Sequence, residues 1–351
     1  MSCSQLVREK KMQLYAELIE IILNELMYES RCEAFRKCSY GEHNRYKKYR
    51  VLCNKNRYAS RQGLLSTVFI MLPNIIEARL HGYIPVIDLC QNSQFQILLQ
   101  EKHLAKIENA WEYYFTQPND GVTLEEVWQS KYVERQIKDC RNPNYFIGDK
   151  YLQSNFQTRL LGGAIRRNIY LQPRIENKVI HEGKTLFSRM NKVLGVGIRA
   201  GYRADIIMNN KTLDGHPNVG SCADCIRNIE KKLVEWKYDT FFLSIDDRKY
   251  LEEIKNYFGD TCIYFERPRI HYFQDAMLDI PTIDKDETTI EMSNVSVRSK
   301  NEDYLVEIYL LAQCDGLYAS RGTGYNFAYL LNNGSYSHVE FADLGEFHYA
   351  K

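Results

Sequence analysis

The chain has 351 residues, which is long for a single hydrophobic core, so we expect two domains. Its net charge is +1, from 46 Lys and Arg against 45 Asp and Glu, and this balance gives no reason to expect a nucleic-acid partner. The 10 cysteines are scattered, and no signal peptide or apolar span of about twenty residues is visible, which predicts reduced thiols in a cytoplasmic protein.

Residues 1–58 are expected to form a helical and basic extension. Leu6 to Met27 carries apolar residues mostly along one helical stripe, which predicts an amphipathic helix. A basic segment with interleaved tyrosines follows, and it consists of Arg45, Tyr46, Lys47, Lys48, Tyr49, Arg50, Lys55, Arg57, Tyr58 and Arg61. Such a segment suits either a solvated surface or contact with an anionic membrane or nucleic acid, and the sequence leaves these open.

A first α/β domain is expected over residues 59–180. After a glycine turn at Gly63, an apolar run predicts a helix that stops at Gly82, and Ile84 to Leu89 then reads as a strand. Further along, aromatic rings and a carboxylate lie side by side in the sequence at Trp111, Glu112 and Tyr113. These groups suit either binding of sugar rings or packing in a core.

A second α/β domain is expected over residues 181–351. Val193 to Ile198 is an apolar, β-branched run with two glycines, which predicts a buried strand whose backbone is closely approached. Arg199 follows this strand directly. Apolar residues at helical spacing then predict a helix over Cys222 to Trp236, and a second strand, Phe241 to Ile245, ends in a carboxylate pair. Ligands of parallel α/β sheets bind at such strand ends.

A glycine turn near the end of the chain follows a further predicted strand. The strand is expected over Gly316 to Ala319, the turn reads Ser320-Arg321-Gly322-Thr323-Gly324, and a helix is expected from Tyr325 to Leu331. Such a turn lets backbone N–H groups approach a ligand, and the N-terminus of the helix favours an anion.

Several motifs together resemble one family of sugar transferases. They are LGVGIRAGYR, GHP, FFLSIDDRKYLEEIKNYFGD, VEIYLLAQCDGLYASRGTG and WEYYF, in matching order along roughly Ala59 to Gly345. They resemble the fucosyltransferase superfamily, which includes N-glycan core α1,6-fucosyltransferases, rhizobial nodulation fucosyltransferases and protein O-fucosyltransferases. The likeness is greatest to bacterial members that act on surface polysaccharides.

The resemblance implies a GT-B architecture, with two facing Rossmann-like domains behind an N-terminal helical extension. Residues 59–180 would form the acceptor-side domain and residues 181–351 the nucleotide-sugar domain. The implied reaction is an inverting transfer from a GDP-sugar, most often GDP-fucose, with no metal ion and no other cofactor. A guanidinium and a helix N-terminus can stabilise the leaving diphosphate without a metal.

The resemblance also implies roles for individual residues. Arg199 would bind the diphosphate, Asp246 would lie near the nucleoside, and Glu307 would accept hydrogen bonds from guanine. The donor site as a whole would comprise Gly63, Gly197, Arg203, Asp246, Asp247, Glu307, Ser320, Gly322, Thr323 and Gly324. The acceptor would contact Trp111, Glu112 and Tyr113. The catalytic base would be one of Asp214, His216 and Asp205, with Asp214 and His216 preferred.

The chain departs from the family pattern at several positions. Gly197 stands where many relatives have histidine, Tyr202 where the nearest bacterial relatives have aspartate, and Glu307 is one methylene longer than the usual aspartate. These departures motivate an alternative, which is a catalytically inactive protein that binds a sugar nucleotide or serves as a scaffold. A dinucleotide-binding enzyme is a further alternative, although no GxGxxG motif follows a predicted strand.

The expected partners are a nucleotide sugar and a glycan or lipid-linked oligosaccharide acceptor, and no nucleic acid. The expected location is the cytoplasm, with a peripheral contact at the inner face of the cell membrane left open. Cys222 and Cys225 form a CxxC at the start of a predicted helix. The pair fits a redox site, half of a zinc site, or two ordinary thiols on a helix face.

Overall fold

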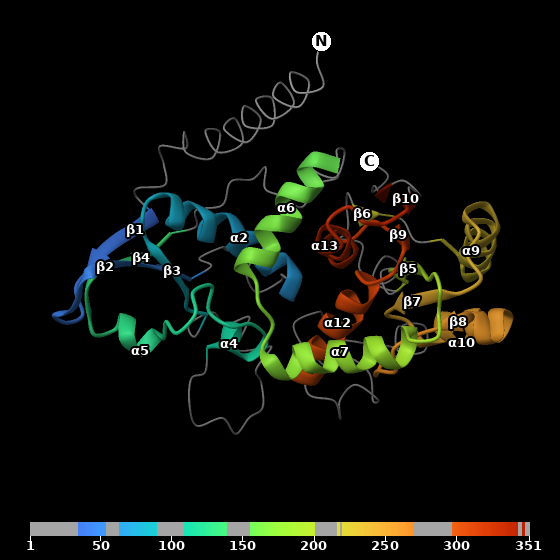
Figure 1. Ribbon diagram of the computed structural model, residues 1–351, viewed down its shortest axis with the longest axis horizontal. Helices are drawn as coiled ribbons and strands as arrows, with labels where there is room; N and C mark the ends of the chain where they lie inside the picture. Colours follow the sequence, from blue (N-terminus) through green and yellow to red (C-terminus); the bar gives the residue numbers. More distant parts are fainter. Residues whose placement is uncertain are drawn as a thin grey trace, which may run out of the picture.

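The computed structural model describes residues 34–53, 63–89, 109–138, 155–200, 216–217, 220–269, 297–342 and 346–347 (Figure 1). Their secondary structure is mixed α/β, as the sequence predicts. It comprises a four-stranded sheet, a five-stranded sheet and a short pairing of β6 (His216–Pro217) with β11 (Glu346–Phe347). No helix in these ranges is both long and apolar enough to cross a membrane.

The first sheet has the strand order β1-β4-β2-β3. Its strands are β1 (Phe35–Cys38), β2 (His43–Leu52), β3 (Ile84–Ile87) and β4 (Ser130–Gln136). Strands β4, β2 and β3 run parallel, and β1 is antiparallel to β4. Because β1 and β2 precede residue 59, part of the expected N-terminal extension belongs to this sheet.

The basic segment is a strand as far as it is described, and this corrects the interpretation of residues 45–52 as part of an extension. Tyr49 of β2 is fully buried, and its hydroxyl donates a hydrogen bond to Glu126. Arg50 is 8% exposed and lies 2.8 Å from the Glu134 carboxylate on the neighbouring strand β4. Arg50 is therefore paired inside the protein, whereas Arg45 and Lys48 of the same segment are exposed. The predicted helix over residues 6–27 lies outside the described residues.

Helix α2 (Leu64–Leu80) begins after Gly63 and ends before Gly82, as predicted. Gly82 has a φ of +72°, a left-handed conformation that favours glycine. Strand β3 follows at the predicted place, and it ends at Ile87 where the sequence predicts an end at Leu89. The remaining helices before the second sheet are α4 (Ala110–Tyr114), α5 (Leu124–Val127), α6 (Asn155–Asn168) and α7 (Pro173–Phe187).

The second sheet is entirely parallel and has the order β10-β9-β5-β7-β8. Its strands are β5 (Leu194–Ile198), β7 (Phe241–Ile245), β8 (Cys262–Ile263), β9 (Gly316–Ser320) and β10 (His338–Ala342). The chain starts at the central strand β5 and builds outward to β8. It then crosses back to place β9 and β10 on the other side of β5. This is the doubly wound order of dinucleotide-binding domains.

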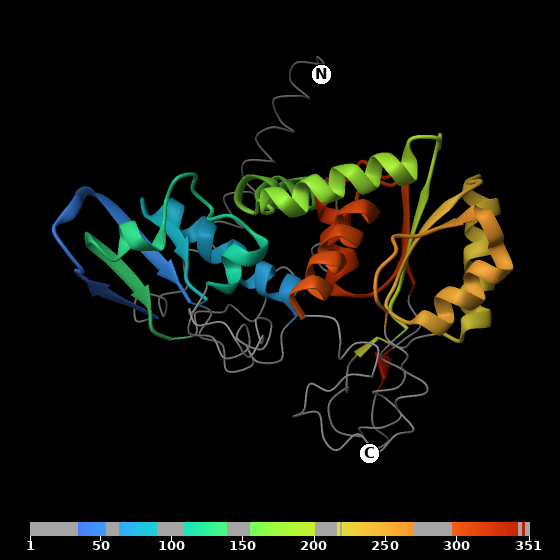
Figure 2. The same ribbon diagram turned by 90° about the horizontal axis from the view of Figure 1, so that it is seen from below.

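Helices cover both faces of the second sheet (Figure 2). On one face, α9 (Cys222–Trp236) and α10 (Arg248–Phe258) pack on Leu194, Val196 and Ile198 of β5. On the other face lie α7, α12 (Val297–Leu311) and α13 (Thr323–Leu331). Side chains of a strand alternate between faces, so Gly195 and Gly197 face the second group.

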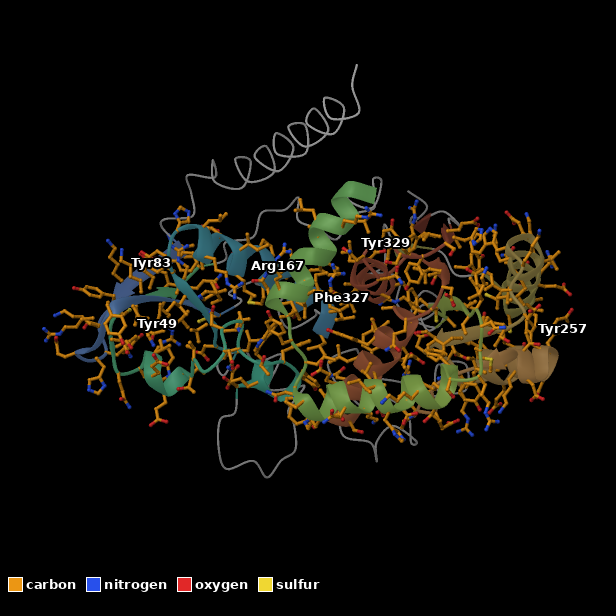
Figure 3. The ribbon with its side chains drawn as sticks, viewed as in Figure 1. Tyr49, Tyr83, Arg167, Tyr257, Phe327 and Tyr329 are labelled. Atoms are coloured by element: carbon orange, nitrogen blue, oxygen red, sulfur yellow. The ribbon has the colours of Figure 1, made fainter. Side chains whose placement is uncertain are left out.

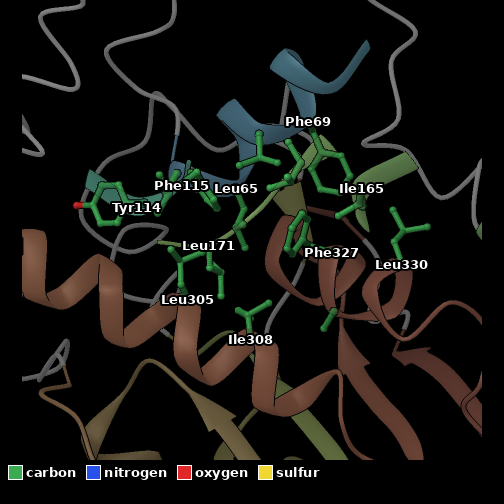
Figure 4. Packing of buried hydrophobic residues seen from close by; sticks show 14 of the residues in the cluster. Leu65, Phe69, Tyr114, Phe115, Ile165, Leu171, Leu305, Ile308, Phe327 and Leu330 are labelled. Atoms are coloured by element: carbon green, nitrogen blue, oxygen red, sulfur yellow. The ribbon is translucent and has the colours of Figure 1, made fainter. Parts of the chain in front are cut away.

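The two sheets share one apolar cluster at the centre of the molecule. Phe327 and Tyr329 of α13 lie between Tyr49 of the first sheet and Tyr257 of α10 (Figure 3). Leu65 and Phe69 of α2 pack against Phe327 (Figure 4), and the two phenylalanine rings are 5.7 Å apart. Burial between the sheets explains why α2 is apolar on nearly every side.

The glycines of β5 admit side chains from the helices, which confirms the predicted close approach to this backbone. A Cβ atom on Gly195 would lie 2.7 Å from Leu311 Cδ1, and one on Gly197 would lie 2.7 Å from the Tyr325 ring. The helices α12 and α13 can therefore lie directly on the sheet only because these positions carry no side chain.

We expect Gly197→Ala to lower the free energy of unfolding by about 1–3 kcal/mol, since the added methyl group must displace the Tyr325 ring. Urea denaturation measures this change. Gly322→Ala is a matched control, because its Cβ would meet Tyr325 Cδ2 at an ordinary 3.6 Å. Equal stability of Gly197→Ala and the wild type would show that the ring moves freely.

Candidate functional site

The candidate site lies where the strand order of the second sheet reverses. Strands β5 and β9 pair directly, with Gly197 beside Ala319, and the chain leaves them toward opposite faces. In a doubly wound sheet, a crevice opens at the carboxyl ends of two such strands, and ligands bind there. The residues that follow β5 and β9 are therefore the first candidates for ligand contact.

Arg199 and Ser320 occupy these two strand ends. The Arg199 backbone N–H donates a hydrogen bond to Ser320 Oγ at 2.9 Å, and the Ser320 hydroxyl donates to the Gly197 carbonyl at 3.3 Å. Arg199 itself is partly exposed. The structure thus brings together these two residues, which lie 121 positions apart in the sequence. The hydrogen bonds fix the two strand ends relative to each other.

The N-terminus of helix α13 lies beside the Arg199 guanidinium. Gly322 is the N-cap residue, and no side chain caps the helix there. A Cβ atom placed on Gly322 would lie 3.7 Å from Arg199 Nη1. Backbone N–H groups in the first turn of a helix have no acceptor within the helix. The predicted residues Gly322, Thr323 and Gly324 therefore join Arg199 in a place that favours an anion.

The two neighbouring aspartates after β7 have different surroundings. Asp246 Oδ1 accepts a hydrogen bond from the Ala200 backbone N–H at 2.9 Å, which links the end of β7 to the end of β5. Asp247 is 2% exposed and caps helix α10 by accepting from the Tyr250 N–H at 2.9 Å. Asp246 thus lies beside the candidate site, and its contact with the donor stays a prediction, whereas the buried Asp247 carboxylate serves as a helix cap in place of the expected donor contact.

Glu307 of α12 is fully buried between two arginines. Its carboxylate lies 2.6 Å from Arg267 Nη2 and 3.1 Å from Arg269 Nη2, and it accepts a hydrogen bond from the Ser244 hydroxyl at 3.2 Å. Both arginines also donate to the Ile245 carbonyl at the end of β7. Because Glu307 is fully buried, the guanine contact expected of it would require the covering side chains to move.

The arginine pair was not among the predicted site residues. Arg267 and Arg269 follow β8 and are separated from Glu307 by 40 and 38 positions. Their one sequence signal is the presence of arginines in a loop after a strand of the second domain. That signal cannot identify a partner so distant in the chain, because the pairing depends on the crossing from β8 to α12.

Two tyrosines lie between the helices and the charged residues of the site. Burial raises the pKa of Tyr304 to about 12, although the Arg199 guanidinium acts in the opposite direction. Burial also raises the pKa of Tyr325 well above its ordinary value. Both phenols therefore stay protonated at neutral pH, and neither is a candidate for a general base.

The two other predicted donor-site glycines differ in their surroundings. The face of Gly197 is covered by the Tyr325 ring, so a histidine at this position would not fit. The covering ring is a physical reason for this departure from the family pattern. Gly63 is exposed at the start of α2, and no atom of the described residues lies within 4 Å of a Cβ placed on it.

Comparisons with known proteins give matches among solved structures alone. No family model and no curated protein matches the chain. The structure of NodZ α1,6-fucosyltransferase soaked with GDP-fucose matches with a TM-score of 0.43 and 13% identity, over 81% of this chain and 93% of that chain. NodZ from Bradyrhizobium matches with a TM-score of 0.40 and 12% identity, over 80% and 92%.

A plant enzyme also matches. The structure of Arabidopsis thaliana FUT1 in complex with GDP has a TM-score of 0.42 and 12% identity, over 83% of this chain and 70% of that chain. The chain is therefore similar to members of the group that its motifs resemble. Because the TM-scores are below 0.5, this likeness alone assigns no activity.

The predicted acceptor contacts fall in the first α/β unit. Trp111 is 1% exposed, and its indole N–H donates to the Thr116 carbonyl, so stacking of a sugar on this ring is corrected to a core role. Glu112 accepts from the Gln117 amide at 2.8 Å. The Tyr113 ring is covered by the Arg174 guanidinium at 4.3 Å. Packing in a core, the alternative interpretation of these rings, is correct for Trp111.

The remaining predicted residues are not placed. Arg203, Asp205 and Asp214 lie outside the described residues. The backbone of His216 is described in β6, where it pairs with Phe347, but its side chain is not. The identity of the catalytic base therefore stays a prediction.

The CxxC pair lies in the first turn of α9. Burial raises the pKa of the Cys222 thiol to about 12, with a further contribution from a hydrogen bond to Glu253. Burial likewise raises the pKa of Cys225 to about 11. Redox cysteines have lowered pKa values, so this pair is better interpreted as two ordinary thiols.

Proposed function

We propose that this chain is a glycosyltransferase that transfers a sugar from a GDP-sugar to a glycan acceptor. The observation that carries the proposal is the position of the Arg199 guanidinium beside the N-terminus of α13, at the point where the sheet order reverses. That arrangement suits a nucleoside diphosphate. The choice of GDP-fucose as the donor follows from the motif resemblance, as does a GT-B arrangement with the donor on the second domain.

The chemistry assigned to Arg199 is stabilisation of the leaving group. As the bond between the sugar and the diphosphate breaks, negative charge grows on the departing phosphate oxygen. A planar guanidinium and the N–H groups of a helix N-terminus can accept that charge through hydrogen bonds that already point to it. We therefore propose an inverting transfer that needs no metal ion.

The acceptor hydroxyl must lose a proton as it attacks the sugar. Asp214 and His216 are the preferred candidates for the base, with Asp205 as a third. The proposed setting is the assembly of a bacterial surface polysaccharide in the cytoplasm, on a glycan or lipid-linked acceptor.

A second candidate function is a catalytically inactive sugar-nucleotide-binding or scaffold protein. The covered face of Gly197 favours it, because the ring of Tyr325 fills the place in which many relatives carry a histidine. This candidate predicts donor binding without release of GDP.

A transfer assay separates the two candidates. The purified chain is incubated with GDP-fucose or GDP-mannose and a mixture of glycan acceptors, with and without EDTA, and the release of GDP is measured. A glycosyltransferase releases GDP in both conditions, and the release depends on the acceptor. Binding of the donor without release would support the scaffold, and loss of activity in EDTA would contradict the metal-independent mechanism.

A further inference from the structure

An open pocket of about 540 Å³ lies between the start of β2 and helix α5. These two elements lie at the end of the molecule away from α9 and α10 (Figure 1). The pocket is largely open to solvent, so it suits a ligand that stays partly in water. The side chains that matter for its chemistry are His43, Asn44, Tyr46, Glu125, Glu126 and Gln129. None of these residues belongs to the candidate site of the second sheet.

An irregularity in the strand pairing shapes this pocket. The register between β2 and β4 shifts between His43 and Lys48. Asn44 has a φ of +49°, and its side-chain amide donates to Ser130 Oγ at 3.0 Å. Irregularities of this kind redirect side chains and are common beside functional sites, as are left-handed residues other than glycine. They place the side chains of Asn44 and Tyr46 at the pocket.

The two walls of the pocket are held together by the backbone. The His43 N–H donates to the Gln129 carbonyl and the Tyr40 N–H to the Ser130 carbonyl, each at 3.1 Å. A Cβ on Gly41 would overlap the Gln129 carbonyl, so a glycine is needed for the walls to come this close. The pocket is therefore formed before a ligand arrives, which lowers the entropic cost of binding.

The charges around the pocket balance one another. Lys47 pairs with Glu126 at 2.7 Å, and Glu42 pairs with both Arg45 at 2.7 Å and Lys131 at 3.0 Å. Glu125, on the pocket lining, and Lys48 of β2 are both exposed and of opposite charge. Since neither sign of charge dominates, the pocket suits a neutral ligand.

The aromatic and polar side chains that line the pocket suit a sugar. The Tyr46 ring is 85% exposed at the pocket, although a large aromatic surface in water is costly to keep uncovered. The C–H face of a sugar can cover such a ring, and amide, imidazole and carboxylate groups can bond its hydroxyls. We propose that this pocket binds a neutral oligosaccharide, with Tyr46 as the stacking platform. This goes beyond the proposed transfer reaction, and it holds whether or not the chain transfers sugar.

Direct binding tests this proposal. The full chain is applied to an array of neutral oligosaccharides built from glucose, galactose, mannose and N-acetylglucosamine, and affinities are then measured by calorimetry. Heparin and vesicles that contain phosphatidylserine serve as the anionic probes. The variants are Tyr46→Ala, Tyr46→Phe and, as a matched control, Tyr257→Ala, which removes a 56% exposed tyrosine at the opposite end of the molecule (Figure 3).

At least one neutral oligosaccharide is expected to bind the wild type, and Tyr46→Ala is expected to weaken this binding about tenfold. Tyr46→Phe keeps the ring and should bind within about twofold of the wild type, as should Tyr257→Ala. The proposal is overturned if no neutral oligosaccharide binds, if heparin or the vesicles alone bind, or if Tyr46→Ala binds as well as Tyr46→Phe. The exposed position of Tyr46 lets all variants fold, which circular dichroism checks.

Discussion

Arg199→Ala is expected to remove about half or more of the stabilisation that GDP gives to the wild-type chain. A ligand at a hundred times its Kd raises the free energy of unfolding by about 2.7 kcal/mol, which is visible as a rise in Tm. Hydrogen bonds to charged groups contribute about 1.5–3 kcal/mol, so the variant should bind GDP roughly 10–100-fold more weakly. Because the same charge is needed as the diphosphate leaves, sugar transfer should fall about 10²–10³-fold.

Thermal unfolding with GDP, GDP-fucose, GDP-mannose, UDP, ADP and NAD measures the binding part of this prediction. Arg189→Ala is the matched control, because Arg189 is exposed and precedes β5, at the opposite edge of the sheet. The control should retain the full shift with guanine nucleotides. A shift with NAD and none with GDP would instead favour a dinucleotide-binding enzyme.

Glu307→Ala is expected to lower the free energy of unfolding by about 3–5 kcal/mol, because it leaves two guanidinium charges buried without their shared counterion. Arg267 and Arg269 have 7% and 1% exposed side chains, so water cannot replace the carboxylate. Urea denaturation measures the loss. Glu252→Ala removes an exposed carboxylate paired with Arg248 and should change stability by less than about 1 kcal/mol.

A triple variant separates the effect of charge from that of packing. Replacing Glu307 with leucine and both arginines with methionine removes all three charges and keeps most of the volume. Its stability should be much nearer to the wild type than that of Glu307→Ala, since apolar groups can replace a buried ion network. A Glu307→Ala variant as stable as the Glu252→Ala control would show that the arginines do not depend on this carboxylate.

The sequence predicts the second sheet well because its signals are local. Strand β5 is a continuous apolar run, α9 has apolar residues at helical spacing, and the glycines of β5 indicate close packing. The position of Arg199 at a strand end follows from the same pattern. The sequence does not show that the strand order reverses between β5 and β9, since this reversal depends on how the chain crosses the sheet.

Strands β2 and β4 of the first sheet escape sequence analysis because they carry charges that are paired at a distance, whereas the apolar strand β3 is predicted. Arg50 of β2 and Glu134 of β4 neutralise each other, although each alone indicates an exposed position. For the same reason, the sequence cannot tell that Glu307 has two arginine partners. It also cannot distinguish the helix cap Asp247 from Asp246, which lies at the site.

Hydrogen–deuterium exchange with and without GDP tests most directly whether a nucleotide binds at the switch between β5 and β9. The account predicts slower exchange in peptides that cover residues 198–200 and 320–326 when GDP is present. It predicts no change in residues 34–53 of the first sheet. Protection confined to other segments, or an exchange pattern that GDP leaves unchanged, would contradict the account.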